Sequence, residues 1–215
     1  MTIVLSPTIP TTPLSTYAQL QASVANWAHR SDLDALIPDF VTLAESRISR
    51  DLRLRKQITS TTLTTTAGAP GLAMPVDWLE FKTLSIGSDG IQRQLAYAPI
   101  RHMDAKYNNT PHGVPEVYTI EGDNVLFAPT PGSAYEVDVV YYARFPSLIT
   151  AGTNWLMTNH PNIYLFAVLV ELYHYTQNPE QIQAYTARYF AELKQLQDQD
   201  VRATHSGSAL RIKAI

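Results

Sequence analysis

The sequence predicts an α+β fold: an antiparallel helical bundle of two N-terminal and two C-terminal helices, an inserted small antiparallel β domain, and extended terminal tails. Apolar residues recur at helical spacing before residue 57 and again after residue 157. The stretch between them is rich in β-branched residues and is punctuated by turn residues. Neither helical pair is large enough to bury its apolar faces alone, so we expect the two pairs to close on one another.

A chain of 215 residues fits one generous domain that carries an insertion. We therefore divide it into four parts: an extended N-terminal segment, 1–14; a helical bundle domain, 15–56 and 158–203; a β-rich insertion domain, 57–157; and a C-terminal tail, 204–215.

The N-terminal helical pair has recognisable boundaries. Prolines at positions 7, 10 and 13 exclude a helix in the first segment and favour extended backbone. Thr16 and Gln19 form a capping-box pattern, which predicts a helix over about 17–29. Pro38 then suits a first helical turn, and apolar residues share one face as far as about residue 54.

The central and C-terminal parts follow with different periods. A β-hairpin with a four-residue loop at 121–124 and an alternating strand at 135–142 are predicted, with a short helix near 99–107. Helical spacing resumes at Pro161, and Asn178-Pro179 separates the last two helices. Ser206, Gly207 and Ser208 then form a hinge-like stretch before a short basic and apolar tip.

Composition excludes several classes of function. The chain has no Cys, so thiolate metal sites and Cys nucleophiles are excluded, and its net charge of −3 offers no global basic field for DNA. Only 16% of residues are charged, and a surface poor in charge is easier to bury against a partner. The chain shows no signal-peptide pattern, and its most apolar stretch, 163–170, is too short to span a bilayer. We expect a soluble protein without a membrane partner.

No catalytic or metal-binding constellation stands out, so we expect no enzyme, no metal and no cofactor. No pair of histidines has ligand spacing with a nearby carboxylate, and no phosphate-binding glycine loop is present. A small hydrolase that uses His102, Asp104 and His112 of the β insertion is the enzymatic alternative. Residues two apart on a helix, such as His102 and Asp104, point away from each other, which disfavours it.

Two features favour assembly instead. Arg47, Arg50 and Arg53 are spaced by three residues and form a stripe beside the apolar face of the second helix. Three parallel arginines repel one another unless something negative faces them, although they also suit a helix C-terminus. The twelve tyrosines suit interfaces that are buried but still hydrogen-bonded, and equally a core with satisfied hydroxyls.

Several stretches of the chain resemble one known family. They are WAHRSDL at 27–33, IPDF at 37–40, AESRISRDLR at 44–53, MPVDWLE at 74–80, and the helical pair that begins at Asn162. Together they resemble the tailed-phage head-to-tail adaptor (connector) family, and the chain is similar to podophage tail tubular protein A and portal adaptor proteins.

The resemblance implies a virion subunit assembled in the host bacterial cytoplasm. It implies a dodecameric ring beneath the portal protein, with DNA passing through the lumen without sequence-specific binding, and a surface for a tail or nozzle protein. It also implies two sets of contact residues: Leu210, Arg211, Ile212 and Lys213 as portal contacts, and Arg47, Arg50 and Arg53 as ring contacts. Another virion ring, such as a tail-completion or stopper protein, is the alternative.

Overall fold

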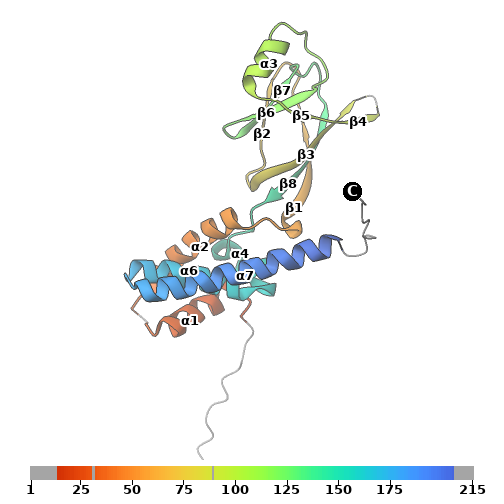
Figure 1. Ribbon diagram of the computed structural model, residues 1–215. Helices are drawn as coiled ribbons and strands as arrows, with labels where there is room; N and C mark the ends of the chain where they lie inside the picture. Colours follow the sequence, from red (N-terminus) through yellow and green to blue (C-terminus); the bar gives the residue numbers. More distant parts are fainter. Residues whose placement is uncertain (1–13, 31, 89, 206–215) are drawn as a thin grey trace, which may run out of the picture. The chain divides into compact units, whose positions relative to one another are not determined.

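The structure, a computed structural model, describes residues 14–30, 32–88 and 90–205 (Figure 1). It confirms the predicted mixed α+β class. The chain forms two compact units, one of Met1–Leu52 with Phe145–Ile215 and the other of Arg53–Arg144. The first is called the helical unit below, and the second the β unit.

Within the described residues, the helical unit contains six α-helices and one short 3-10 helix. Its elements are α1 (Tyr17–Ala28), η1 (Asp34–Leu36), α2 (Ile37–Asp51), α4 (Leu148–Ala151), α5 (Trp155–Asn159), α6 (Pro161–Tyr175) and α7 (Pro179–His205). The capping box that begins α1 is confirmed, because Thr16 Oγ1 accepts from Gln19 N and the Gln19 side chain accepts from Thr16 N. Pro38 and Pro161 stand in the first turns of α2 and α6, as predicted.

Helix α6 is the centre of the helical unit. Every residue from Ile163 to Val170 is buried, and α1, α2, α5 and α7 all contact this helix. A helix that is apolar on all sides must be covered on all sides, which explains why its sequence lacks the polar face seen on α2 and α7. The antiparallel bundle as a complete arrangement stays a prediction.

Helices α4 and α5 were not predicted. They span four and five residues, which is too short for a helical period to show in the sequence. Gly152 ends α4 in the left-handed region at φ 74°, a conformation that glycine adopts without steric cost. The predicted domain limits at 57 and 157 stay a prediction, because compactness within one chain does not show which segment folds by itself.

The described part of the β unit consists of two four-stranded sheets, one α-helix and one short 3-10 helix. Its elements are η2 (Arg55–Gln57), β1 (Ile58–Thr64), β2 (Gly71–Ala73), β3 (Trp78–Ser88), β4 (Ile91–Gln94), β5 (Ala96–Tyr97), α3 (Ile100–Tyr107), β6 (Val117–Glu121), β7 (Asn124–Ala128) and β8 (Glu136–Ala143). The strand orders are β1-β8-β3-β4 and β2-β7-β6-β5. All pairs are antiparallel except β5 with β6, which corrects the prediction of a wholly antiparallel domain.

The predicted hairpin is present with a tighter turn. Glu121 and Asn124 pair directly, so the loop has two residues rather than four. Gly122 lies at φ 59°, which matches the left-handed backbone that two-residue hairpin loops require.

The core of the β unit lies between the two sheets. Alternate residues of β8 point inward, as the sequence predicted, and they join apolar residues of β3 and β7. The buried cluster contains Leu84, Ile86, Leu95, Val125, Phe127, Val137, Val139 and Tyr141. Helix α3 covers a smaller cluster through Met103, which packs with Ala98 and Ala128.

Candidate assembly site

Helix α2 buries one face and exposes the other. Its buried residues, spaced by three and four, are Ile37, Phe40, Val41, Ala44 and Ile48. The opposite side carries Asp39, Thr42, Leu43, Ser46 and Arg50, here called the α2 face. Leu43 is 53% exposed at the middle of this face. An apolar side chain between an acidic end and a basic end is an arrangement typical of a small contact surface.

Arg47 is held inside the helical unit. Its Nε and Nη2 atoms donate to Glu171 Oε1 of α6 at 2.8 and 2.6 Å. The two side chains are only 24% and 14% exposed, so water screens this ion pair weakly. The negative partner that the arginine stripe requires is therefore supplied, at this position, by the chain itself.

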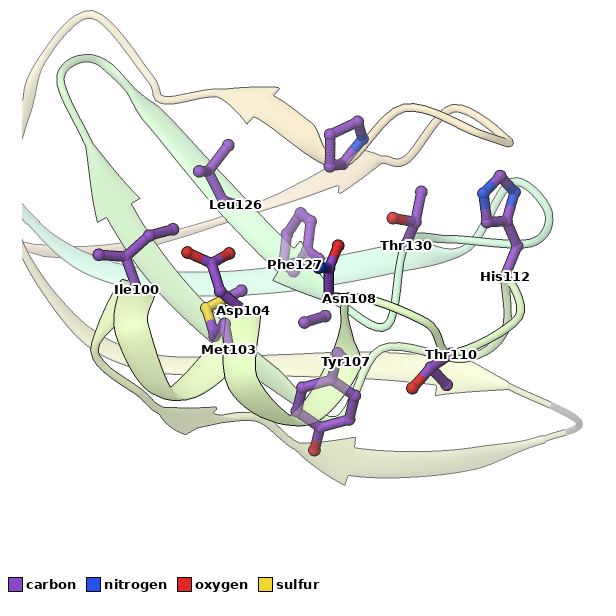
Figure 2. A pocket seen from close by; sticks show the side chains of 12 residues that line it. Ile100, Met103, Asp104, Tyr107, Asn108, Thr110, His112, Leu126, Phe127 and Thr130 are labelled. Carbon is purple, nitrogen blue, oxygen red and sulfur yellow. The ribbon is translucent and has the colours of Figure 1, made fainter.

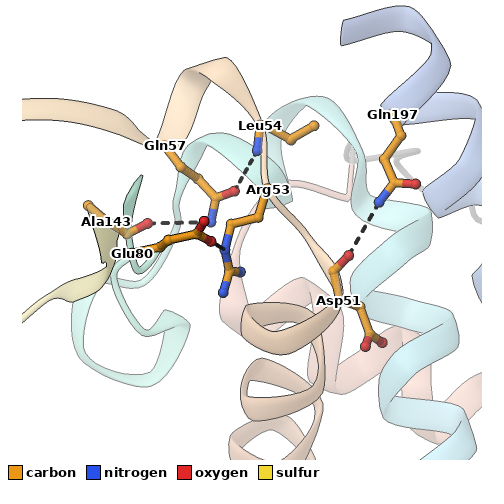
Figure 3. Close-up of polar contacts among 7 residues, drawn as sticks. All are labelled: Asp51, Arg53, Leu54, Gln57, Glu80, Ala143 and Gln197. Atoms are coloured by element: carbon orange, nitrogen blue, oxygen red, sulfur yellow. Dashed lines mark hydrogen bonds and ion pairs between the residues drawn. The ribbon is translucent and has the colours of Figure 1, made fainter. Parts of the chain in front are cut away.

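Arg53 belongs to the β unit and has a more exposed partner. Its Nε atom lies 3.3 Å from Glu80 Oε2, with side chains 33% and 61% exposed (Figure 3). Glu80 ends the MPVDWLE stretch that carried part of the family resemblance. An ion pair of this exposure contributes little to stability.

Arg50 is the exposed member of the stripe. Within residues 14–30, 32–88 and 90–205, its side chain makes no hydrogen bond or ion pair. The next residue is firmly fixed. Asp51 Oδ2 accepts from Tyr189 Oη at 3.0 Å. Asp51 O accepts from Gln197 Nε2 at 3.3 Å (Figure 3). Burial and the neighbouring carboxylate of Asp51 raise the pKa of Tyr189 above its ordinary value. The backbone that presents Arg50 is thus anchored to α7.

A second anchored segment leads into α6. Asn154 caps α5 by accepting from Met157 N at 2.9 Å, and its Nδ2 donates to Pro146 O and to Tyr164 Oη. Burial raises the pKa of Tyr164, which keeps its hydroxyl neutral. Glu45 of α2 accepts from Leu148 N at 2.7 Å and so caps α4. Sequence reasoning missed both roles. The partner of Glu45 lies 103 residues away, and Asn154 begins a helix of only five residues, too short for a helical period to show.

The MPVDWLE stretch has a structural role in the β unit. Asp77 Oδ1 accepts from Tyr141 Oη at 3.0 Å, which joins the start of β3 to β8. Burial, assisted by Asp77, raises the pKa of Tyr141 to about 12. Trp78 packs on Phe81 with ring centroids 5.1 Å apart. These residues therefore position strands, and none of them forms a reactive pair.

The structure brings together only two of the three residues that the hydrolase alternative requires. A pocket of about 270 Å³ between α3 and β7 is lined by Asp104 and His112 but not by His102 (Figure 2). Figure 2 shows Asp104 and His112 apart, with Asn108 drawn between them. No hydrogen bond joins the three among the residues that the structure describes, and no group of three metal-ligating side chains occurs there.

The candidate portal contacts Leu210, Arg211, Ile212 and Lys213 lie outside the described residues. So does the N-terminal segment up to residue 13. None of the helices in the described part of the chain combines the length and the apolar character needed to cross a membrane.

A family model of phage head-to-tail adaptors, a class of structural proteins, matches residues 15–212. The match covers residues of both the helical unit and the β unit. The chain belongs to the SU10 adaptor protein family. The match confirms the resemblance that the sequence motifs suggested. It indicates a virion protein that associates with other virion proteins, such as portal and tail, and the family is structural rather than enzymatic. No curated protein matches the chain.

Proposed function

We propose that the protein is a ring-forming adaptor subunit that attaches beneath the portal, continues the DNA channel, and presents a platform for tail or nozzle proteins. The observation that carries the proposal is the adaptor family match, which extends over both the helical unit and the β unit. A dodecamer is the proposed ring size, following the adaptor family.

The α2 face is the proposed contact between neighbouring subunits. Leu43 provides an apolar centre, and Arg50 provides a charge that the described residues leave without an ion-pair partner. Arg47 and Arg53 complete the proposed set of ring contacts, Arg47 by holding α2 to α6 through Glu171. A partner carboxylate opposite Arg50 would form a charge-assisted hydrogen bond that contributes more than a neutral one.

A charge reversal tests this contact. Arg50→Glu should lower the fraction of protein in rings, measured by native mass spectrometry, by at least tenfold at a fixed concentration. Lys82→Glu is the matched control, because Lys82 is also exposed but lies on β3. Equal ring fractions for both variants would exclude Arg50 from the interface.

The C-terminal tip is the proposed portal contact. Leu210 and Ile212 can enter an apolar groove, while Arg211 and Lys213 can pair with acidic side chains beside it. Twelve tethered copies in one ring would reinforce one another, since each docked tip raises the effective concentration of the next. Removal of residues 206–215 should abolish co-sedimentation with portal while the ring mass falls only by the deleted residues. Normal portal binding by the truncated ring would exclude the tip.

DNA is the proposed content of the channel, without sequence-specific contacts. The net charge of −3 disfavours tight binding to phosphates, so DNA can slide. The alternative is a stopper or tail-completion ring, which shares the assembly but binds an adaptor ring instead of the portal. Co-sedimentation with purified portal alone separates the two, because a stopper would not bind it.

A hydrolase is the less favoured alternative, and the shared pocket of Asp104 and His112 is its one support. The variant with His102→Ala, Asp104→Asn and His112→Ala should assemble and attach to portal like the unmodified protein. An adaptor that assembles normally but loses an assayed hydrolytic activity in this variant would favour the enzyme.

A further inference from the structure

Strand β1 is an open edge of its sheet. Among the residues that the structure describes, it pairs only with β8, in an unbroken register from Ile58 with Tyr142 to Thr64 with Glu136. In the same register, Thr65 N donates to Tyr135 O at 3.0 Å. Hydrogen-bonded pairs alternate along an antiparallel pair, so the odd-numbered residues of β1 bond to β8. The N–H and C=O groups of Ser60, Thr62 and Thr64 therefore point away from the sheet.

A second bond confirms this assignment. Leu95 N donates to Leu84 O at 2.8 Å, so the even-numbered residues of β3 bond toward β4. The odd-numbered residues of β3 must then face β8, and Ser85 pairs with Asp138. The even-numbered residues of β8 are thereby occupied by β3, which leaves its odd-numbered residues for β1.

The edge of β1 lacks the features that normally protect an edge. Edge strands are usually short, or carry charged residues, proline or a bulge that prevent another strand from pairing. Among the described strands, the other three edges follow this rule. β2 has three residues between Pro70 and Pro75, β5 has two residues, and β4 carries Arg93. β1 has seven residues, ITSTTLT, with no charge, no proline and no bulge.

The surface along β1 is also suited to a strand. A shallow hollow is lined by Ser60, Thr61, Thr62 and Asp138. Leu63 lies on the face of the strand opposite Ser60 and Thr62, and it packs against the core of the β unit. A strand added at this edge would place one row of side chains beside hydroxyl groups and the other beside the margin of the apolar core.

We propose that β1 accepts residues 2–6 of a neighbouring copy, Thr2-Ile3-Val4-Leu5-Ser6, as an additional strand. This run is uncharged, like β1, and contains β-branched and apolar residues that favour strands. The prolines at 7, 10 and 13 exclude a helix between it and α1. This proposal depends on the proposed function in one respect: a neighbouring copy of the chain must be present, as it is in a ring.

The reach of the segment allows an exchange between copies. Ser15 is held at the start of α1, because Thr153 Oγ1 donates to Ser15 O at 2.6 Å and Tyr17 N donates to Gly152 O. Val4 lies eleven positions before Ser15, which corresponds to at most about 40 Å of extended chain.

Disulfide trapping between two single-cysteine variants tests the proposal. The chain has no cysteine, so every cross-link is assignable. A mixture of Val4→Cys and Ser60→Cys, assembled together and mildly oxidised, should give a mixed covalent dimer. Paired strands place Cα atoms about 5.5 Å apart, which a disulfide can span. Gln94→Cys, on the outer edge of β4, is the matched control and should cross-link to Val4→Cys at least tenfold less.

A blocking variant separates pairing from mere proximity. Thr64→Lys, placed in the Ser60→Cys variant, should lower its cross-linking to Val4→Cys at least tenfold, since a charge on the edge opposes strand addition. Circular dichroism should be unchanged, because the Thr64 N–H does not contribute to the β1–β8 pairing.

The possible results decide between the two proposals. Rings of the expected mass without any Val4–Ser60 cross-link would overturn strand addition and leave the adaptor ring intact. Equal cross-linking to Gln94→Cys, or preferential cross-linking of Ser60→Cys to Ile212→Cys, would also overturn it. A chain that stays monomeric at every concentration would contradict both proposals.

Discussion

The helical unit and the β unit satisfy their polar groups in different ways. In the helical unit, Glu45 and Asp51 bond to elements more than a hundred residues away, and Asn154 bonds to Tyr164 of the next long helix, so its helices are tied together by side chains. In the β unit the sheets themselves bond most backbone groups, and β1 leaves one row open. The comparison indicates that the helical unit is closed around α6, whereas the β unit has backbone available for a partner.

The largest expected effect is the loss of the Asn154 network. Asn154→Ala removes three hydrogen bonds and leaves the buried Tyr164 hydroxyl and Met157 N–H without their partner. We expect the free energy of unfolding to fall by about 3 kcal/mol, measured by urea denaturation. Asn159→Ala is the control, because Asn159 is exposed and its side chain, among the described residues, bonds only to Trp155 O. It should change stability by less than about 0.5 kcal/mol. Equal effects would mean that the network does not tie the unit together.

The two arginine ion pairs provide the next comparison. Arg47→Met should destabilise the protein by roughly 2 kcal/mol, because Glu171 would remain a largely buried carboxylate without its partner. Arg53→Met should cost less than about 0.5 kcal/mol, because Glu80 is well exposed to water. Both values come from chemical denaturation of the same protein. A larger loss of stability in Arg53→Met than in Arg47→Met would contradict the view that side-chain contacts tie the helical unit together more tightly than the β unit.

Two buried tyrosines allow the same substitution in each unit. Tyr189→Phe and Tyr141→Phe each remove one hydroxyl that donates to a carboxylate, Asp51 in the helical unit and Asp77 in the β unit. We expect each to lower the free energy of unfolding by about 1 kcal/mol. The pKa of Tyr141, raised to about 12, also implies that stability present below pH 10 is lost as pH rises toward 12. Tyr141→Phe should reduce the fall in the free energy of unfolding between pH 10 and pH 12. An unchanged dependence on pH would exclude Tyr141 as its source.

The smallest expected effect is an acid dependence at His160, where α5 meets α6. Burial lowers the pKa of His160, although Glu192 acts in the opposite direction. A lowered pKa in the folded state means that the stability present above about pH 6.5 declines as pH falls through the folded pKa. Thermal unfolding measured from pH 8 to pH 5 should therefore show a shallower decline for His160→Gln. An identical decline in both proteins would show that other groups cause it.

Sequence reasoning predicted best where local signals were strong. The capping box at Thr16, the prolines at the starts of α2 and α6, and the alternation along β8 each involve neighbours within a few residues. Helices α4 and α5 were missed because they are short. The hairpin loop was predicted too long because the sequence does not show that Glu121 and Asn124 belong to the paired strands.

The candidate site was predictable only in part. The spacing of Arg47, Arg50 and Arg53 indicated a stripe, but not that Glu171 and Glu80 would bind two of its members. Those partners lie 124 and 27 residues away in the sequence, so no local pattern could assign them. The open edge of β1 was equally hidden, because it depends on which strand pairs with β8.

The mass of the purified assembly, measured by native mass spectrometry with and without the portal protein, tests the adaptor ring most directly. We predict a closed ring of many copies, twelve in the proposed form, and a further discrete complex when portal is added. A monomer that ignores portal under both conditions would contradict it.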